Sequence, residues 1–119
     1  MDKVNIAQKL SLFDEHWSPR IVGEINESFV KLAKISGEFV WHKHDNEDEL
    51  FFVVSGRMRM EFRDRSLDVG EGEMIVVPRG IEHRPVADEE VHLLLFEPAG
   101  TLNTGNVVNE RTVREPGSI

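Results

Sequence analysis

The stretch ELFFVVSGRMRMEF, residues 49–62, carries the strongest structural signal in the chain. Its first half is dense in Phe, Leu and Val, and a Ser-Gly pair follows at residues 55–56. Residues 57–62 then alternate charged and apolar side chains without a break. A period of two is typical of a half-buried strand, and a Ser-Gly pair between two such runs is typical of a turn. We therefore predict two strands that form a hairpin, with the chain reversing at Gly56.

Similar strand-like segments extend from this stretch in both directions, separated by turn-forming residues. They lie at residues 20–25, 28–35, 39–44, 67–69, 73–77, 83–87 and 91–96, and Asp88-Glu89-Glu90 is expected to form a turn. Many short strands at this spacing indicate an all-β sandwich or barrel. Residues 4–13 have apolar side chains at positions 6, 10 and 13, which predicts one or two turns of amphipathic helix before the strands.

The composition of the 119 residues limits the classes of protein that fit. The length suits a single domain, 1–119, and we expect a barrel core over residues 20–97 between an N-terminal arm, 1–19, and a C-terminal tail, 98–119. The absence of cysteine excludes disulfides, thiolate metal sites and cysteine nucleophiles. A net charge of −8 disfavours nucleic acid and anionic membranes as partners. Because no apolar run approaches transmembrane length and no secretory signal is visible, we expect a cytoplasmic protein.

Four side chains in the strand-rich region are candidates for one metal site. His42 and His44 are two residues apart, so in a strand both imidazoles point to the same side. Glu49 can return beside them on the next antiparallel strand, and His83 follows the turn-forming segment 78–80. Three imidazoles and one carboxylate suit a divalent ion of iron, manganese, nickel, cobalt or zinc. The ordinary alternative is that these histidines are surface or core residues, because short motifs produce many false matches.

The spacing of these residues resembles the two motifs of the cupin superfamily. The first motif, a glycine followed by His-x-His, a glutamate and a second glycine, is represented by Gly37, His42, His44, Glu49 and Gly56. The second, a glycine followed by Pro-x-Gly and a histidine, is represented by Gly72, Pro78, Gly80 and His83. The chain departs from the pattern in two places: four residues instead of five separate Gly37 from His42, and Ala87 stands where the family has asparagine. Neither departure affects a metal-ligand position, and the resemblance covers about residues 28–97.

The resemblance implies a fold, a metal and an oligomeric state. The fold is the cupin double-stranded β-helix, a jelly-roll-like barrel, with a short N-terminal helix or turn. The divalent metal ion would be held by His42, His44, Glu49 and His83, and the chain would form a homodimer. Residues 1–25 and 100–119 are candidates for the surface that meets the partner chain, because pairing between chains covers exposed strand edges. The small single-domain form is similar to the mannose-6-phosphate-isomerase-like type of cupin.

The resemblance leaves the chemistry open, because cupins include dioxygenases, isomerases and non-catalytic binding proteins. One hypothesis is a metal-dependent dioxygenase or isomerase whose small, oxygen-rich substrate chelates the metal. The alternative is a non-catalytic module that captures a small molecule, with a metal that is structural or holds the ligand. The sequence identifies no general base beyond the metal ligands. The candidates for the wall of a substrate pocket are apolar, namely Phe51, Val53, Met58, Met60 and Phe96.

A sugar phosphate is a poor fit as the substrate, because its phosphate needs a basic clamp. Arg57 and Arg59 alternate away from the apolar face of their strand, which leaves Arg79 and Arg84 as the candidates for such a clamp.

Two further features are left open by the sequence. His92 alternates with Leu94 and Phe96, and we expect a core or surface residue there rather than a fifth ligand. The polar tail, residues 100–119, has three alternatives: order against the barrel, order against a partner chain, or fraying.

Overall fold

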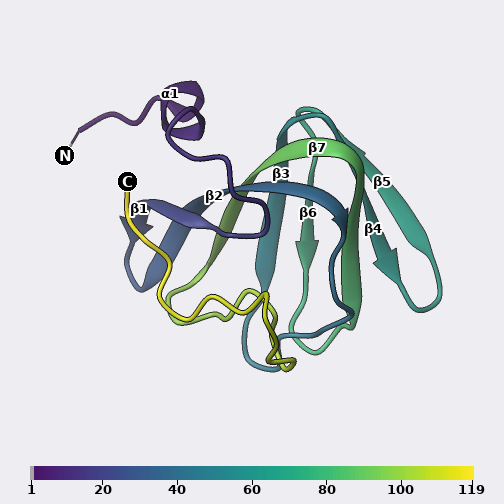
Figure 1. Ribbon diagram of the computed structural model, residues 1–119. Coiled ribbons are helices and arrows are strands. Elements are labelled where there is room, and N and C mark those ends of the chain that lie inside the picture. The colour runs from purple at the N-terminus through teal and green to yellow at the C-terminus, as the bar shows by residue number, and fades with distance from the viewer. Residues whose placement is uncertain (1) are drawn as a thin grey trace.

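Nearly all of the regular structure is antiparallel β-sheet, as the computed structural model shows for residues 2–119 (Figure 1). The elements in chain order are α1 (Ile6–Leu10), β1 (Arg20–Ile25), β2 (Ser28–Glu38), β3 (Glu49–Ser55), β4 (Arg57–Phe62), β5 (Ser66–Gly70), β6 (Met74–Val77) and β7 (His83–Pro98). The predicted all-β fold is therefore confirmed. Within residues 2–119, no helix is long and apolar enough to cross a membrane.

The long strand β7 organises the sheet, because three other strands pair with it. Its first part pairs with β4, its last part pairs with β3, and β2 runs beside most of its length. The order through the sheet is β1-β2-β7-β3-β6, and β5 is joined to β4. Figure 1 shows the strands curling around a common interior, with β4 and β5 on the side opposite β1. This curvature brings the beginnings of β3 and β7 to the same end of the barrel.

The hairpin predicted over residues 49–62 is wrong, although both of its strands are present. β3 and β4 do not pair with each other, since each pairs antiparallel with a different part of β7. Gly56, with φ of 95°, bends one continuous run as it passes around the barrel. A Cβ at Gly56 would lie 3.1 Å from the Glu90 carbonyl oxygen, so the close approach of β7 requires glycine there.

The turn predicted at residues 88–90 does not form either, for the same reason. Asp88, Glu89 and Glu90 lie within β7, opposite the bend at Gly56. All three side chains are exposed, while the residues on either side of them are buried. They mark the outside of a barrel corner, where the strand changes partners from β4 to β3 without ending. A run of acidic residues is therefore compatible with a strand where its side chains are exposed.

The strand predicted over residues 39–44 is also absent. Regular pairing of β2 with β7 shifts register between Ile35 and Gly37, and Gly37 has φ of 82°. The pairing resumes at Gly37 and Glu38, where β2 ends, and His42 then forms an isolated bridge with His83. The backbone of Lys43 pairs with the C-terminal tail instead.

The short helix packs on the outside of the sheet, within the segment predicted to be helical. Asn5 caps it, because its side-chain oxygen accepts a hydrogen bond of 2.9 Å from the backbone amide of Gln8. Leu10 and Phe13 are buried against Leu32 of β2. Burial of each such side chain contributes about 1.5–3 kcal/mol, which holds the N-terminal arm on the barrel. The larger apolar cluster fills the barrel interior.

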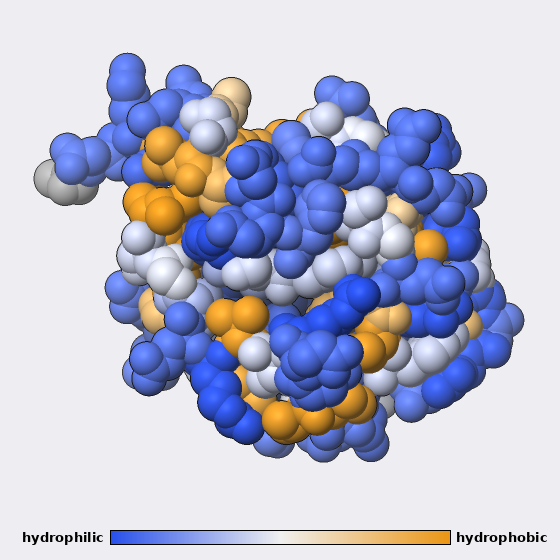
Figure 2. Space-filling model, viewed as in Figure 1, coloured by the Kyte–Doolittle hydropathy of each residue, from blue (hydrophilic) through white to orange (hydrophobic). Residues whose placement is uncertain are grey.

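The C-terminal tail is ordered against this same chain. Asn106 forms two hydrogen bonds with the backbone of Lys43: its amide donates to the Lys43 carbonyl at 3.0 Å, and its side-chain oxygen accepts from the Lys43 amide at 2.9 Å. Farther on, the amide of Ile119 donates to the carbonyl of Ile21 in β1 at 3.0 Å. Figure 1 shows this yellow segment crossing one end of the barrel before it returns to β1, and Figure 2 shows a mainly hydrophilic surface on the same face.

Candidate metal centre

Four buried side chains meet at the end of the barrel that the tail crosses. His42 and His44 lie in the connection between β2 and β3, Glu49 begins β3, and His83 begins β7. One potential ligand atom from each residue lies within 4.8 Å of those of the other three. The structure thus brings together all four residues that the motif spacing singled out. Each is at most 4% exposed, although all four are polar or ionisable.

The backbone fixes two of these residues relative to each other. The amide of His42 donates to the carbonyl of His83 at 3.0 Å, and the amide of His83 donates to the carbonyl of His42 at 2.8 Å. Their imidazole centroids lie 4.3 Å apart. Glu49 Oε1 lies 3.2 Å from His44 Nε2 and 3.9 Å from His83 Nε2. The carboxylate therefore faces the same space as the imidazole nitrogens.

Hydrogen bonds outside the cluster orient two of the imidazoles for metal binding. Nδ1 of His42 lies 2.9 Å from the carbonyl oxygen of Val40, and Nδ1 of His83 lies 2.9 Å from that of Ile81. A carbonyl only accepts, so each Nδ1 carries the proton and each Nε2 keeps its lone pair. A metal-binding histidine commonly has its second nitrogen held in this way.

Unpartnered nitrogen atoms show that the residues present fit a metal ion. Both ring nitrogens of His44 and Nε2 of His83 are buried without a hydrogen-bond partner. A buried polar atom without a partner is costly, typically by about 1–3 kcal/mol. A divalent cation coordinated by three imidazoles and a carboxylate would satisfy these atoms, and such donors suit transition metals.

Burial also sets the protonation of the site. It lowers the pKa of His42 to about 3, with a further contribution from the neighbouring His83, and it lowers the pKa of His83 to about 4. Burial lowers the pKa of His44 as well, and it raises the pKa of Glu49. The imidazoles are therefore neutral at neutral pH, which is the form that binds a metal.

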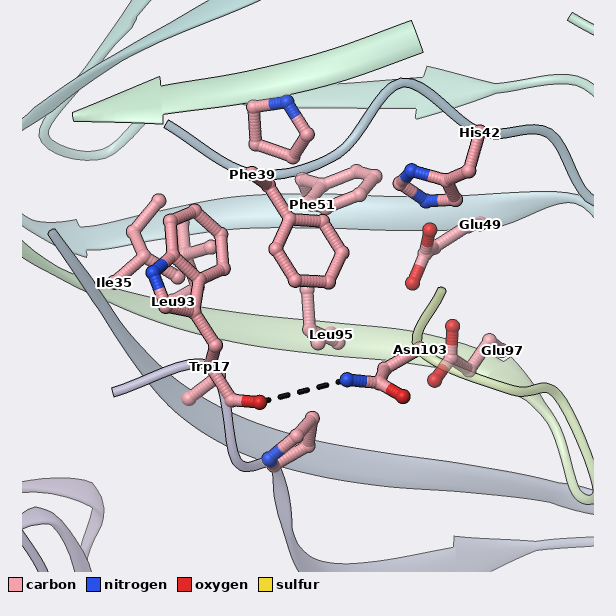
Figure 3. Close-up of a pocket in the computed structure, with 13 residues that line it drawn as sticks. Trp17, Ile35, Phe39, His42, Glu49, Phe51, Leu93, Leu95, Glu97 and Asn103 are labelled. Carbon is pink, nitrogen blue, oxygen red and sulfur yellow. Dashed lines mark hydrogen bonds between the residues drawn. The ribbon is translucent and has the colours of Figure 1, made fainter. Parts of the chain in front are cut away.

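A cavity of about 40 Å³ lies beside the cluster (Figure 3). Figure 3 shows Glu49, Glu97 and Asn103 gathered at one end, together with His42, while Trp17 and other apolar side chains lie toward the opposite end. The tail contributes Asn103 to the wall, and its amide nitrogen donates to the Trp17 carbonyl at 3.4 Å. The cavity is therefore polar at the metal cluster and apolar away from it.

Only one of the predicted pocket residues lines this cavity. Phe51 does so, whereas Val53, Met58 and Met60 belong to the buried core and Phe96 lines a separate surface hollow. The side chains of Val53, Met58 and Met60 pack in the barrel interior, and none of them lines the cavity. The alternation of apolar and polar residues along the strands identified which positions are buried. It could not distinguish positions in the core from positions in the cavity wall.

Sequence reasoning missed Glu97, Trp17 and Asn103. The sequence could have indicated that Glu97 is buried. Every second residue from Val91 to Leu95 is apolar and buried, and Glu97 continues this alternation in β7. Trp17 and Asn103 lie in irregular segments outside both motifs, and no local pattern marks them.

Glu97 belongs to a buried ion pair. Nζ of Lys31 donates to Oε1 of Glu97 at 2.8 Å, and both side chains are at most 3% exposed. Burial and the nearby Glu49 carboxylate raise the pKa of Glu97, while the Lys31 ammonium opposes this shift.

The arginines proposed as a phosphate clamp are engaged elsewhere. Arg79 donates to the carboxylate of Asp48, and Arg84 donates to Glu61. His92 is half-buried at the surface, 3.6 Å from Glu90, and is not part of the cluster. Neither arginine is left unpaired to receive a phosphate group.

Comparison with known proteins adds independent support for the fold. A crystal structure of a cupin-2 domain containing protein from Shewanella frigidimarina NCIMB 400 superposes with a TM-score of 0.79. That protein is 46% identical in sequence, and the match covers 80% of this chain and 93% of the other.

Two curated relatives are also similar in sequence. The uncharacterized protein YdbB of Bacillus subtilis (strain 168) is 36% identical over 64 residues, 53% of this chain. Acireductone dioxygenase of Phaeosphaeria nodorum is 30% identical over 110 residues, 82% of this chain. This chain spans 57% and 59% of the lengths of these two relatives. Residues 28–97 match the Cupin domain family, and together with the fold and the four converging side chains this match shows that the chain belongs to the cupin family.

Proposed function

We propose that this cupin binds a small, oxygen-rich molecule at a divalent metal ion and acts on it with dioxygenase-like chemistry. The observation that carries the proposal is the convergence of three neutral imidazoles and one carboxylate beside a cavity. His42, His44, Glu49 and His83 would hold the ion. When bound, the metal ion supplies Lewis-acid polarisation of the ligand's oxygen atoms and the redox chemistry of a dioxygenase.

The chain's own residues prepare the site for an oxygen ligand. The three imidazoles are neutral and Glu49 brings one negative charge, so a divalent cation leaves the group with a net charge of about +1. That residual charge favours a ligand that presents anionic or strongly polar oxygen atoms. Apolar side chains such as Phe39 and Phe51 exclude water from the cavity, which strengthens electrostatic interactions inside it.

Dioxygenase-like chemistry is better supported than isomerase-like chemistry. The similarity to acireductone dioxygenase extends over 82% of this chain, although this chain spans only 59% of that protein. An aldose–ketose isomerase acting on a sugar phosphate needs a cationic clamp. Arg79 and Arg84 are already paired with carboxylates and do not provide one.

A non-catalytic binding module is the second candidate, and the size of the cavity favours it. About 40 Å³ has room for only two or three water molecules. The tail residue Asn103 forms part of the wall, so a larger ligand requires the tail to move. A site closed in this way would retain a captured ligand rather than exchange it rapidly.

Metal content and oxygen consumption distinguish these functions. Protein purified without a histidine tag would be analysed for bound metal, and oxygen uptake would be recorded with acireductone and with a panel of vicinal diketones. We expect about one metal ion per chain and oxygen uptake with at least one compound, lost in His83→Ala and retained in His92→Ala. Metal-loaded protein that retains a compound unchanged, without oxygen uptake, would favour the binding module and contradict the dioxygenase.

A further inference from the structure

Glu97 occupies a position where the strand pattern calls for an apolar side chain. Along β7, Val91, Leu93 and Leu95 are buried on one face, and Glu97 continues the same face at 2% exposure. A glutamate is almost never buried to this extent unless it is paired. Its presence at the end of this row therefore needs an explanation beyond core packing.

Pairing with Lys31 accounts for only one of the two carboxyl oxygens. Nζ of Lys31 donates to Oε1 at 2.8 Å, whereas Oε2 accepts from no donor group, and the Glu97 carboxyl lies within hydrogen-bonding reach of the Glu49 carboxyl. A buried ion pair is commonly no more stabilising than two apolar side chains of similar volume. Stability alone therefore does not require this pair, and a buried oxygen that accepts from no donor group is available to a ligand.

The free oxygen belongs to a side chain in the wall of the metal cavity. Glu97 and Glu49 both line the cavity, and Figure 3 shows them at the same end, near Asn103. The cation at this end, Lys31, is already paired with Glu97. Because the charge of Lys31 is already balanced by Glu97, no free cation faces Oε2, and this oxygen suits an uncharged hydroxyl group that can form a hydrogen bond with it.

We propose that Glu97 is a specificity-determining residue of the metal cavity, whose unpartnered oxygen recognises a hydroxyl group of the bound small molecule. This proposal rests on the proposed function, because the metal cluster would hold the other oxygen atoms of the same ligand. Lys31 is a positioning residue that holds the Glu97 carboxyl group toward the cavity. A hydroxyl can either donate to a carboxylate or accept from a carboxyl group, so the contact does not depend on the protonation of Glu97.

A ligand pair that differs by one hydroxyl tests this contact. Binding of 3-hydroxybutan-2-one and of butan-2-one to the cobalt-loaded protein would be measured by calorimetry and by the visible spectrum of the bound cobalt. The ratio of the two dissociation constants would be compared among the wild type, Glu97→Leu, Glu97→Gln and the control Glu61→Gln. Glu61 is a paired glutamate outside the cavity. Comparing ratios separates a contact of the hydroxyl with Glu97 from its contact with the metal, because only the former is removed in Glu97→Leu.

We expect the preference of the wild type and of Glu61→Gln for the hydroxyketone to exceed that of Glu97→Leu by about tenfold, the factor that corresponds to one buried hydrogen bond. Glu97→Gln should recover part of the preference, since an amide also bonds a hydroxyl. An unchanged ratio in a cobalt-loaded Glu97→Leu protein would overturn the assignment of Glu97. If that variant fails to fold, a wild type without any preference would overturn it equally. A wild type that takes up no cobalt would instead overturn the proposed function and this inference with it.

Discussion

His42 and His83 face each other across an isolated antiparallel bridge, in which each backbone amide donates to the other residue's carbonyl at 3.0 and 2.8 Å. Their rings lie 4.3 Å apart between centroids, although one residue follows β2 and the other begins β7. This backbone pairing therefore brings together two candidate ligands from distant parts of the chain. Such preorganisation by backbone and outer hydrogen bonds is what a precise metal site requires.

Removal of one imidazole should abolish metal retention. In His83→Ala the site keeps three of its four ligands, and we expect the affinity for a divalent transition metal to fall at least about 100-fold, beyond the effect of losing an outer hydrogen bond. Elemental analysis after dialysis measures the result. The matched control is His92→Ala, because His92 is half-buried and outside the cluster. Equal metal content in the two variants would contradict the assignment of His83.

The buried histidines should make the metal-free protein sensitive to acid. The pKa of His83 is about 4 in the folded state and about 6.5 in the unfolded chain. Between these values the unfolded chain binds the proton and the folded protein does not, so stability rises with pH. We expect the free energy of unfolding of the wild type, relative to His83→Gln, to rise by about 1.4 kcal/mol per pH unit from pH 4 to 6.5 and to stay level above.

Urea denaturation in the presence of a chelator measures this difference. Burial raises the pKa of Glu49, so this residue makes stability fall as the pH rises. Because Glu49 is present in both proteins, the comparison with His83→Gln cancels its contribution. A difference that does not change between pH 4 and 6.5 would mean that His83 titrates normally in the folded protein.

The tail should detach when a side chain is added at Gly105. A Cβ there would clash with the carbonyl oxygen of Lys43, and φ of 57° is unfavourable for other residues. We expect Gly105→Ala to destabilise the protein by about 1–3 kcal/mol and to speed hydrogen exchange at the amide of Asn106. Gly117→Ala is the control, because a Cβ at Gly117 meets nothing within 4 Å. Matching exchange rates in the two variants would show that the tail does not depend on this contact.

The buried ion pair of Lys31 and Glu97 should contribute little to the free energy of unfolding, but the loss of one partner should destabilise the protein strongly. In Lys31→Met the Glu97 carboxylate loses its counter-charge, and we expect a loss of about 3–5 kcal/mol in the free energy of unfolding. The double variant Lys31→Met/Glu97→Leu removes both charges and should be close to the wild type. Urea denaturation of the three proteins provides the measurement. A double variant as unstable as Lys31→Met would indicate that the pair itself stabilises the fold.

The sequence identified the four side chains that converge because the spacing of its motifs reflects local geometry. His42 and His44 are two positions apart on one side of an extended segment, and Glu49 follows a polar loop that returns the chain. The six strands predicted at 20–25, 28–35, 49–54, 57–62, 67–69 and 73–77 all appear, with differences mainly at their ends. The strands at 83–87 and 91–96 appear as parts of one longer strand.

The errors arose where long-range packing decides the structure. Gly56 and Glu90 each resemble turn residues locally, but they lie opposite each other at one barrel corner that two strands cross without ending. The role of Glu97 depends on its pairing with Lys31 on another strand, which the sequence pattern alone does not show. Self-association through residues 1–25 and 100–119 stays a prediction, and sedimentation at micromolar concentration would test it.

Anomalous scattering from a crystal grown with cobalt tests the central claim most directly. We predict one strong peak at the centre of the cluster, within bonding distance of Nε2 of His42, Nε2 of His83, one ring nitrogen of His44 and the Glu49 carboxylate. A cobalt-saturated crystal with no peak there, or with its peaks only at the protein surface, would contradict the account.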